Sequence, residues 1–508
     1  MRARRPSSSR SRRTRWSRSV DGWRCRRAAR EETRMNTERT WIRGGYVLSM
    51  DEELGDLPIG DVLVEGDRIA AVSHHLEVDD ARVIDAQGHI VMPGFVDTHR
   101  HTWQTQMRGI CADWTLNDYF LGIRLAISPA YSPEDVYVGN YVGALEALNA
   151  GVTTIVDFSH CNNSPEHADA AVEGLRTAGI RALHCYGFFA SAPDPRFPDH
   201  VARRADFVRI VRTYSSTGSL LTIGAALTEV GSIPWSDTVA EVEVAREAHA
   251  RIVTHTGCVW GSLITGGVKE MHAFGLLGPE QIHVHCNTLS DDDWHLLARA
   301  GAKVSISPET ELNMGMGRLA LGKCRAFGIR PTLSCDIVSL NSGDLFSQMR
   351  LALAYQRFAD NDPINQRGAM PQTLTCSARD ALRWATCNGA DACGLELQIG
   401  SLRPGKSADI IVVGGDSFAG HPRHDAAGSV VFQATSQDVR YVLVAGRTVK
   451  RDGSLIGVDL SRTLARAEQS AEAVLARVRQ TTPFLPPKPL PGVDLEAMAR
   501  HNLAAAMG

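Results

Sequence analysis

A regular alternation of short apolar strands and helical patterns is the feature that most limits the possible folds of this 508-residue chain. Residues 152–158 (Val-Thr-Thr-Ile-Val-Asp-Phe) are a β-branched run typical of a buried strand. Helices are predicted on both sides of it, because Ser132-Pro133 and Ser164-Pro165 each combine a capping serine with proline at the first helical position. Counting the strand that ends at His99, eight strands are predicted, the others at 152–158, 180–184, 221–227, 251–256, 281–286, 302–306 and 331–335. Eight strands that alternate with helices predict an α/β fold, a (β/α)8 TIM barrel.

The segments that flank this barrel have a different pattern. Residues 35–92 and 395–457 alternate short strands with turns. We expect these two segments to pair into one small composite β-sandwich domain, with the barrel formed by residues 93–394 between them. Residues 458–508 are interpreted as a C-terminal helix followed by a proline-rich, extended tail.

Histidines stand at the ends of several predicted strands, where a barrel of this kind carries its chemistry. His99 and His101 are two residues apart, so on a strand both side chains point to the same side. His255 lies at the end of the fifth strand, and Asp336 follows the eighth. Three neutral imidazoles and a carboxylate suit a zinc or iron ion and leave a coordination position open for water. One such histidine alone would be interpreted as a core residue, but their common position at strand ends favours a metal site.

Several motifs resemble the amidohydrolase superfamily, in the branch that holds cytosine deaminase, adenosylhomocysteine deaminase and the triazine hydrolases. The resemblance spans about residues 40 to 455. The matching motifs are Pro93-Gly94-Phe95-Val96-Asp97-Thr98-His99-Arg100-His101, Gly151-Val152-Thr153-Thr154, His285-Cys286, the segment around Asp336, and residues 385–390, 400–402 and 405–410.

The resemblance implies a mononuclear site in which His99, His101, His255 and Asp336 bind one divalent metal ion. Zinc is expected and ferrous iron is the alternative, since this donor set suits both. The ion would lower the pKa of its water to near ~7. Asp336 would take the water's proton as general base, and His285 would polarise the substrate or hold the water. Binuclear relatives need a lysine on strand four, and neither 183–189 nor 221–230 contains one.

One position departs from the family pattern. Deaminases of this branch usually carry a glutamate three residues after the strand-five histidine, where this chain has Cys258. A thiol with an ordinary pKa near ~8.5 suits neither proton transfer nor contact with a ring nitrogen. Either another acid takes over this role or the reaction is not ordinary deamination. Glu309 and Glu311, after strand seven, are candidates for that acid, although they could equally cap a helix or face solvent.

Substrate contacts are predicted on the loop that follows the first histidine pair. Trp103, Gln104 and Arg108 lie there, and Trp103 could stack on a planar ring or only pack. Together with Cys258, Glu309 and Glu311, they are the candidate substrate-binding residues. Three functions remain open at this stage. The leading hypothesis is hydrolytic deamination of an amino-substituted, planar N-heterocycle. The alternatives are hydrolysis of a cyclic amide or carbon–halogen bond on the same scaffold, and an inactive barrel kept as an interaction scaffold.

The first 34 residues are a different kind of sequence, with 13 arginines, three acidic residues and no lysine. This composition cannot form a core. It fits a targeting peptide, a nucleic-acid-binding arm, or non-native coding ahead of a start at Met35, and we favour the last of these. Subtracting the segment's charge of +10 (13 − 3) from the net −3 leaves −13, which argues against a nucleic-acid partner.

The cysteine and hydropathy patterns bear on the cellular compartment. The eleven cysteines are scattered without C-x-x-C pairs, which is typical of reduced thiols inside a cell. The sequence contains neither a run of eighteen apolar residues nor a signal peptide, so we expect a cytoplasmic enzyme that does not contact membranes. The family resemblance adds a homodimer as an expectation.

Overall fold

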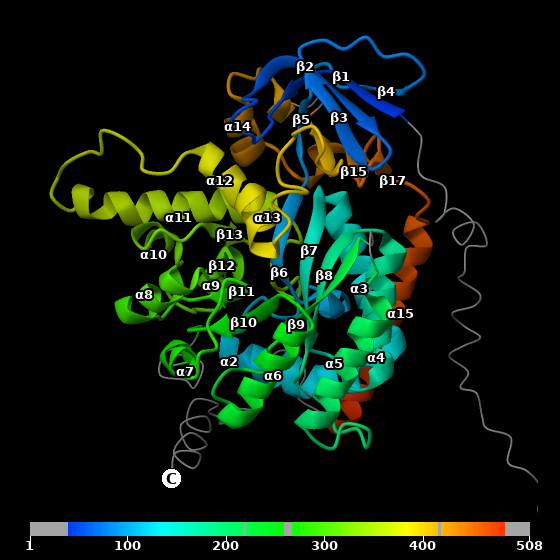
Figure 1. The fold of residues 1–508 in the computed structure, drawn as a ribbon, viewed down its shortest axis with the longest axis vertical. Helices are drawn as coiled ribbons and strands as arrows, with labels where there is room; N and C mark the ends of the chain where they lie inside the picture. Colours follow the sequence, from blue (N-terminus) through cyan, green and yellow to red (C-terminus); the bar gives the residue numbers. More distant parts are fainter. Residues whose placement is uncertain (1–38, 190, 217–219, 259–266, 415–417, 483–508) are drawn as a thin grey trace, which may run out of the picture.

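The computed structural model describes residues 39–189, 191–216, 220–258, 267–414 and 418–482. The N-terminal extension 1–34 and the tail after residue 482 lie outside the described residues. The chain builds a barrel and, above it in Figure 1, a separate mixed sheet. Among the helices of the described part, none has the length and apolar character needed to cross a membrane.

Eight parallel strands form the barrel sheet, in the same order as in the sequence. Val156, Val253 and Ile282 are among the buried apolar side chains that fill its interior. The first and last strands meet at one end, where the amide of Asp336 donates to the carbonyl of His99 at 2.9 Å. The predicted (β/α)8 fold is confirmed. Its strands are β6 (Phe95–Arg100), β7 (Val152–Ser159), β8 (Arg181–Gly187), β9 (Leu221–Ala226), β10 (Ile252–Thr256), β11 (Gln281–His285), β12 (Lys303–Ile306) and β13 (Pro331–Leu333).

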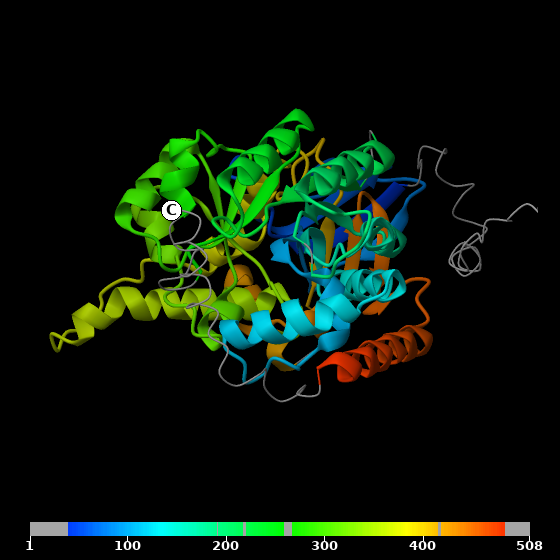
Figure 2. The same cartoon turned by 90° about the horizontal axis from the view of Figure 1, so that it is seen from below.

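Helices surround the outside of the barrel strands (Figure 2). The predicted start of α3 is a capping box: Ser132 Oγ accepts from the Asp135 amide, and the Asp135 carboxylate accepts from the Ser132 amide. The longer helices are α3 (Pro133–Asn149), α4 (Pro165–Ala178), α5 (His200–Tyr214), α6 (Trp235–Glu247), α8 (Asp291–Ala300) and α11 (Leu345–Asn365). Shorter ones are α2 (Leu116–Tyr119), α7 (Gly267–Ala273), α9 (Pro308–Asn313), α10 (Leu321–Ala326), α12 (Ala378–Ala385) and α13 (Cys387–Cys393).

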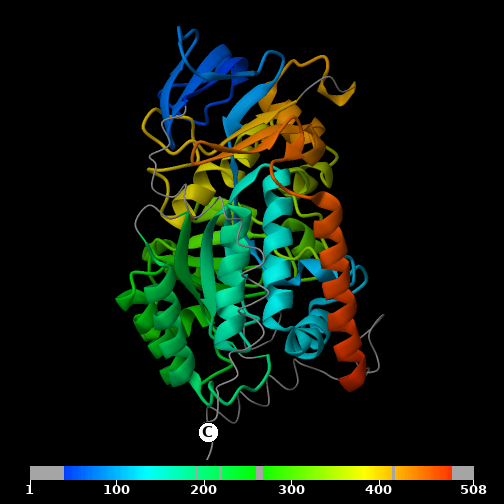
Figure 3. The ribbon, with the colours of Figure 1, turned by 90° about the vertical axis from the view of Figure 1, so that its right-hand side faces the viewer.

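The C-terminal helix α15 (Leu460–Thr481) packs along α3 on the outside of the barrel (Figure 3). Ser470 Oγ donates to Asp135 Oδ1 at 2.6 Å, and Gln106 Nε2 donates to Ser470 Oγ at 3.0 Å. These bonds connect the helix to the N-terminus of α3 and to the loop that follows β6.

The N- and C-terminal segments pair into a single nine-stranded sheet, because β5 runs antiparallel to β14 with Met92 opposite Ile411. Both segments contribute to its core, for example Ile42 and Leu443. Only Gly94 separates β5 from β6, and a Cβ there would lie 2.2 Å from Thr153 Oγ1, so the close approach requires glycine. The strands are β1 (Arg39–Val47), β2 (Leu57–Glu65), β3 (Arg68–Ser73), β4 (Arg82–Asp85), β5 (Ile90–Pro93), β14 (Ile410–Val413), β15 (Val439–Val444), β16 (Arg447–Arg451) and β17 (Ser454–Leu455).

Candidate metal centre

The four predicted metal ligands and His285 converge at the C-terminal end of the barrel. His99 and His101 come from β6, His255 from β10, His285 from the end of β11, and Asp336 follows β13. Asp336 Oδ1 lies 3.2 Å from His99 Nε2 and 3.5 Å from His101 Nε2. Ligand atoms of His99, His101 and His255 lie within 4.8 Å of one another, as do those of His99, His285 and Asp336. All five residues are buried, so the cluster is shielded from bulk water.

The backbone at the site adopts an uncommon conformation. His285 and Asp336 have φ values of 77° and 56°, in the left-handed region that residues other than glycine rarely occupy. This conformation costs free energy and persists only where the surroundings enforce it. At Asp336 the enforcement comes from the barrel closure, since the His101 amide also donates to the Asp336 carbonyl at 2.8 Å. The closure therefore directs the carboxylate toward the histidines.

Hydrogen bonds fix the orientation of three of the imidazoles. His101 Nδ1 donates to the Phe158 carbonyl at 3.0 Å. His255 Nδ1 lies 3.1 Å from both carboxylate oxygens of Glu229, and His285 Nδ1 lies 3.1 Å from Glu311 Oε1. Because Nδ1 of His101 and of His255 carries the proton, Nε2 of each presents a lone pair, as a metal-binding histidine requires.

The donor set fits one divalent metal ion. Neither ring nitrogen of His99 has a hydrogen-bond partner of good geometry in the described part of the chain, although the ring is fully buried. Burial lowers the pKa of His99 to about 4, so its imidazole is neutral at pH 7 and free to bind a cation. Burial alone would raise the pKa of Asp336, but the close approach of His99, whose Nε2 lies 3.2 Å from Asp336 Oδ1, and the other neighbouring imidazoles hold it below its ordinary value. Buried imidazole nitrogens that have no hydrogen-bond partner and lie beside an ionised carboxylate are typical of a metal site.

A pocket opens onto this cluster, and its walls include residues that the sequence analysis missed. The cavity has a volume of ≈ 20 Å³, enough for about one water molecule, so a larger ligand must displace side chains such as the flexible Met314 and Met316. Its lining residues are His101, Leu116, Tyr119, Phe120, Arg124, His255, Cys258, His285, Thr310, Met314, Met316, Asp336 and Ile337.

Glu309 and Glu311, the two predicted replacements for the missing glutamate, lie in different surroundings. Glu311 is buried and accepts bonds from His285, the Ser307 amide (2.7 Å) and Asn287 (2.8 Å), so it orients His285. Glu309 does not line the pocket, and it accepts from Gln348 at 2.6 Å. Cys258 does line the pocket, and burial raises the pKa of its thiol well above the ordinary value, so it is neutral at pH 7.

The three candidates on the loop after β6 are not among the residues that line the pocket. Trp103 is fully buried and donates from Nε1 to His160 Nδ1 at 2.9 Å. Gln104 donates to the hydroxyl of Tyr119, a lining residue, at 3.0 Å. Arg108 is half-exposed and pairs with Glu146 at 2.8 Å. Direct contact of these three residues with a substrate stays a prediction.

His160 is a further histidine at the site that the sequence analysis missed. It follows β7, and its ring stacks on His101 with centroids 4.0 Å apart. Trp103 donates to its Nδ1, so the proton of the neutral ring lies on Nε2, which has no partner in the described residues. The rule that placed the other histidines, position directly after a barrel strand, would also have found His160.

A family model described as "Amidohydrolase family" matches residues 90–449. The chain belongs to the amidohydrolase family. The resemblance inferred from the motifs and the hydrolase class are thereby confirmed. The amidohydrolase is 30% identical over 457 residues to a 5-methylthioadenosine/S-adenosylhomocysteine deaminase of Symbiobacterium thermophilum, covering 85% of this chain and 98% of the relative. It is 28% identical over 451 residues to a 5'-deoxyadenosine deaminase of Methanosarcina mazei, covering 86% of this chain and 98% of the relative.

Solved structures share the fold of this amidohydrolase. An adenosine deaminase from Xanthomonas campestris, with bound zinc, superposes with a TM-score of 0.76 at 22% identity, over 86% of this chain and 98% of the other. A triazine hydrolase from an Arthrobacter species gives a TM-score of 0.75 at 22% identity, over 85% of this chain and 99% of the other.

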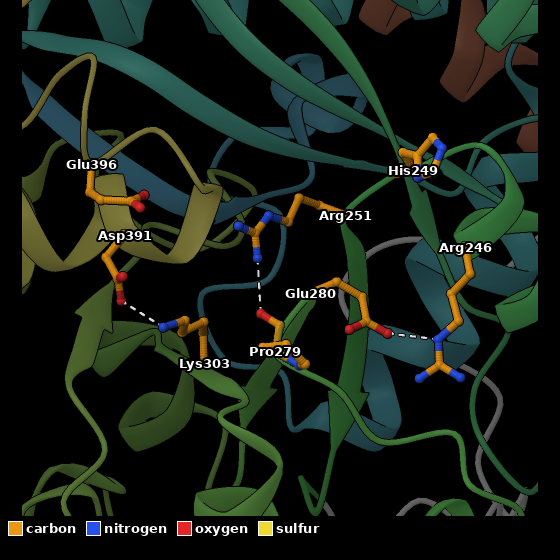
Figure 4. A pocket seen from close by; sticks show the side chains of 9 residues that line it. Arg246, His249, Arg251, Pro279, Glu280, Lys303, Asp391 and Glu396 are labelled. Carbon is orange, nitrogen blue, oxygen red and sulfur yellow. Dashed lines mark hydrogen bonds and ion pairs between the residues drawn. The ribbon is translucent and has the colours of Figure 1, made fainter.

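A second and larger cleft, of ≈ 660 Å³, lies at the opposite end of the amidohydrolase barrel, where β10, β11 and β12 begin (Figure 4). Its charged side chains largely pair with each other: Arg246 Nε lies 2.8 Å from Glu280 Oε1, and Lys303 Nζ lies 2.8 Å from Asp391 Oδ2. Catalytic sites of this fold lie at the other end of the strands. The metal centre, and not this cleft, is therefore the candidate active site.

Replacing Glu229 with glutamine is expected to lower the affinity of the amidohydrolase for its metal about 10- to 100-fold. Burial raises the pKa of this carboxyl, but His255 and Arg124 outweigh burial and lower it to about 2, so the group that holds His255 is an anion. The measurement is the metal retained after dialysis against a series of chelator concentrations. Glu243→Gln, on the exposed face of α6, is the control. Equal retention in both variants would show that Glu229 does not support the metal site.

Proposed function

We propose that this amidohydrolase is a zinc-dependent enzyme that deaminates an amino-substituted N-heterocycle by hydrolysis. The observation that carries the proposal is the buried cluster of His99, His101, His255 and Asp336 at the C-terminal end of the barrel. Relatives that align over almost their whole length are named deaminases of adenosine derivatives, and one neighbour in fold was solved with zinc. The intact, buried donor set argues against an inactive scaffold. The homodimer and the cytoplasmic location stay predictions.

Each side chain has a defined task in this proposal. His99, His101, His255 and Asp336 would hold the ion, which when bound supplies the Lewis acidity that makes water acidic near neutral pH. Asp336 is ionised and accepts the proton of the attacking water. Burial alone would lower the pKa of His285, but Glu311 and Asp336 raise it above its ordinary value, so His285 can donate a hydrogen bond to the substrate.

Cys258 supports a second candidate, hydrolysis of a bond whose leaving group needs no protonation by a glutamate. Among the described residues that line the pocket, Asp336 is the one carboxylate. The neutral thiol of Cys258 occupies the position where the family's deaminases usually have a glutamate. A leaving group such as halide departs as an anion and does not need a proton donor at this position.

Metal analysis combined with a substrate screen tests the proposal. We expect plasma mass spectrometry of the full chain, purified without chelator, to find about one zinc per chain. A panel of amino-substituted pyrimidines, purines and triazines should then include a substrate that releases ammonia, with activity lost on chelation and restored by zinc. Halide release without ammonia would favour the second candidate. A folded protein that takes up no zinc would contradict both.

A further inference from the structure

Arg124 is a buried cation in the wall of the active-site pocket. It lies on the π-helical segment η3 (Phe120–Ile127), is 2% exposed, and lines the cavity together with His255 and Cys258. Its guanidinium carbon lies 4.5 Å from the ring centroid of Phe189. Segments of π-helix are rare and occur frequently at functional sites. A permanent positive charge therefore stands beside the catalytic residues.

The hydrogen-bonding capacity of this guanidinium is not met by the described residues around it. Arg124 Nη1 lies 3.5 Å from Glu229 Oε1, which is longer than an ordinary hydrogen bond of 2.7–3.2 Å. Glu229 is engaged elsewhere, since both its oxygens lie 3.1 Å from His255 Nδ1. Arg124 Nε is buried and has no hydrogen-bond partner in the described part of the chain. Glu229 thus balances the charge of Arg124 without satisfying its donors.

A buried donor left without an acceptor costs free energy, more so when the group is charged, and such groups in native structures call for an explanation. None of the described residues that line the pocket accepts a hydrogen bond from Arg124 Nε. Phe120, Met314 and Met316 are apolar or nearly so, and Cys258 is a neutral thiol. Arginine offers only donors, in a planar fork that matches paired oxygen atoms. An acceptor on a ligand that enters the pocket would complete the hydrogen bonding of Arg124.

We propose that Arg124 is a specificity-determining residue that binds an oxygen of the substrate, so that the substrate is an N-heterocycle bearing a carbonyl or anionic oxygen as well as the group that is hydrolysed. A ring with amino substituents alone would leave the guanidinium without an oxygen acceptor. This inference rests on the proposed function, because it places the ring in the same pocket. It narrows the substrate class, since the proposed function requires only an amino group on the ring.

The test compares two ring ligands of the same size by calorimetry at pH 8 on the zinc-loaded full chain. Barbiturate carries three exocyclic oxygens on its pyrimidine ring and one negative charge, and 2,4,6-triaminopyrimidine carries amino groups at the same positions. Loss of a charge-assisted hydrogen bond should weaken barbiturate binding about 10- to 100-fold in Arg124→Gln. The affinity for triaminopyrimidine should be unchanged, and Arg124→Lys should lose less than Arg124→Gln. Arg176→Gln, which removes an exposed arginine that pairs with Glu173 on α4, is the matched control.

The outcomes separate this inference from the proposed function. Zinc content and the thermal midpoint of each variant show whether it is folded and loaded. If the parent protein binds zinc and releases ammonia from a heterocycle, the proposed function stands whether or not Arg124→Gln changes the affinity for barbiturate. The inference is overturned if barbiturate does not bind the parent protein, or if Arg124→Gln weakens both ligands equally. It is also overturned if Arg176→Gln has the same effect as Arg124→Gln.

Discussion

Replacing Asp336 with asparagine is expected to lower kcat/KM by about 10³-fold or more, because the change removes both the general base and an anionic metal ligand. The substitution keeps the size of the side chain. The backbone bonds that close the barrel, from the Asp336 amide to His99 and from the His101 amide to Asp336, do not involve the side chain. The fold should therefore persist while metal content and turnover fall.

Steady-state rates, zinc content and the thermal midpoint of the same preparation check this expectation. Asp113→Asn is the control, because Asp113 is exposed on the loop after β6 and does not line the pocket. It should leave all three quantities unchanged. Turnover of Asp336→Asn within about tenfold of the parent rate would exclude Asp336 as the base, since general-base catalysis contributes about 10²-fold or more.

The sequence predicted the metal centre because its residues follow from a simple rule of the fold. Each strand of the barrel delivers its last residues to the same end, so the alternation of strands and helices was enough to bring His99, His255 and Asp336 together. The prediction did not depend on side-chain packing. The positive φ of Asp336 was not predictable, because it arises when β13 closes against β6, a contact between residues far apart in the sequence.

The residues around the metal ligands were harder to predict, for two different reasons. Glu229 and His160 follow β9 and β7, so the rule of strand ends extends to them, but Glu229 stands three residues beyond the end of β9 and His160 beyond the predicted end of its strand at residue 158. Arg124 lies within a mainly apolar helical run. Its position in the pocket depends on how the loop after β6 folds back over the barrel. Local sequence patterns carry no information about that arrangement.

Replacing His285 with asparagine is expected to lower kcat by about 10²- to 10⁴-fold, the range for loss of a group that transfers or shares a proton. Unlike Asp336→Asn, this variant should retain its zinc. The reason is that His99, His101, His255 and Asp336 remain as four ligands, while His285, oriented by Glu311 at 3.1 Å, acts on the substrate. Kinetics and metal content of the two variants, measured side by side, therefore separate a metal ligand from a residue that acts on the substrate.

The geometry also allows His285 to be a ligand itself, since its ring nitrogen lies within 4.8 Å of ligand atoms of His99 and Asp336. Loss of zinc from His285→Asn would move His285 into the ligand set and contradict its role toward the substrate. Glu311→Gln is the matched control, because it keeps the imidazole and removes only the anion that orients it. A smaller loss of kcat with full zinc content in that variant would show that the orientation of His285 matters for catalysis, separately from the presence of its ring.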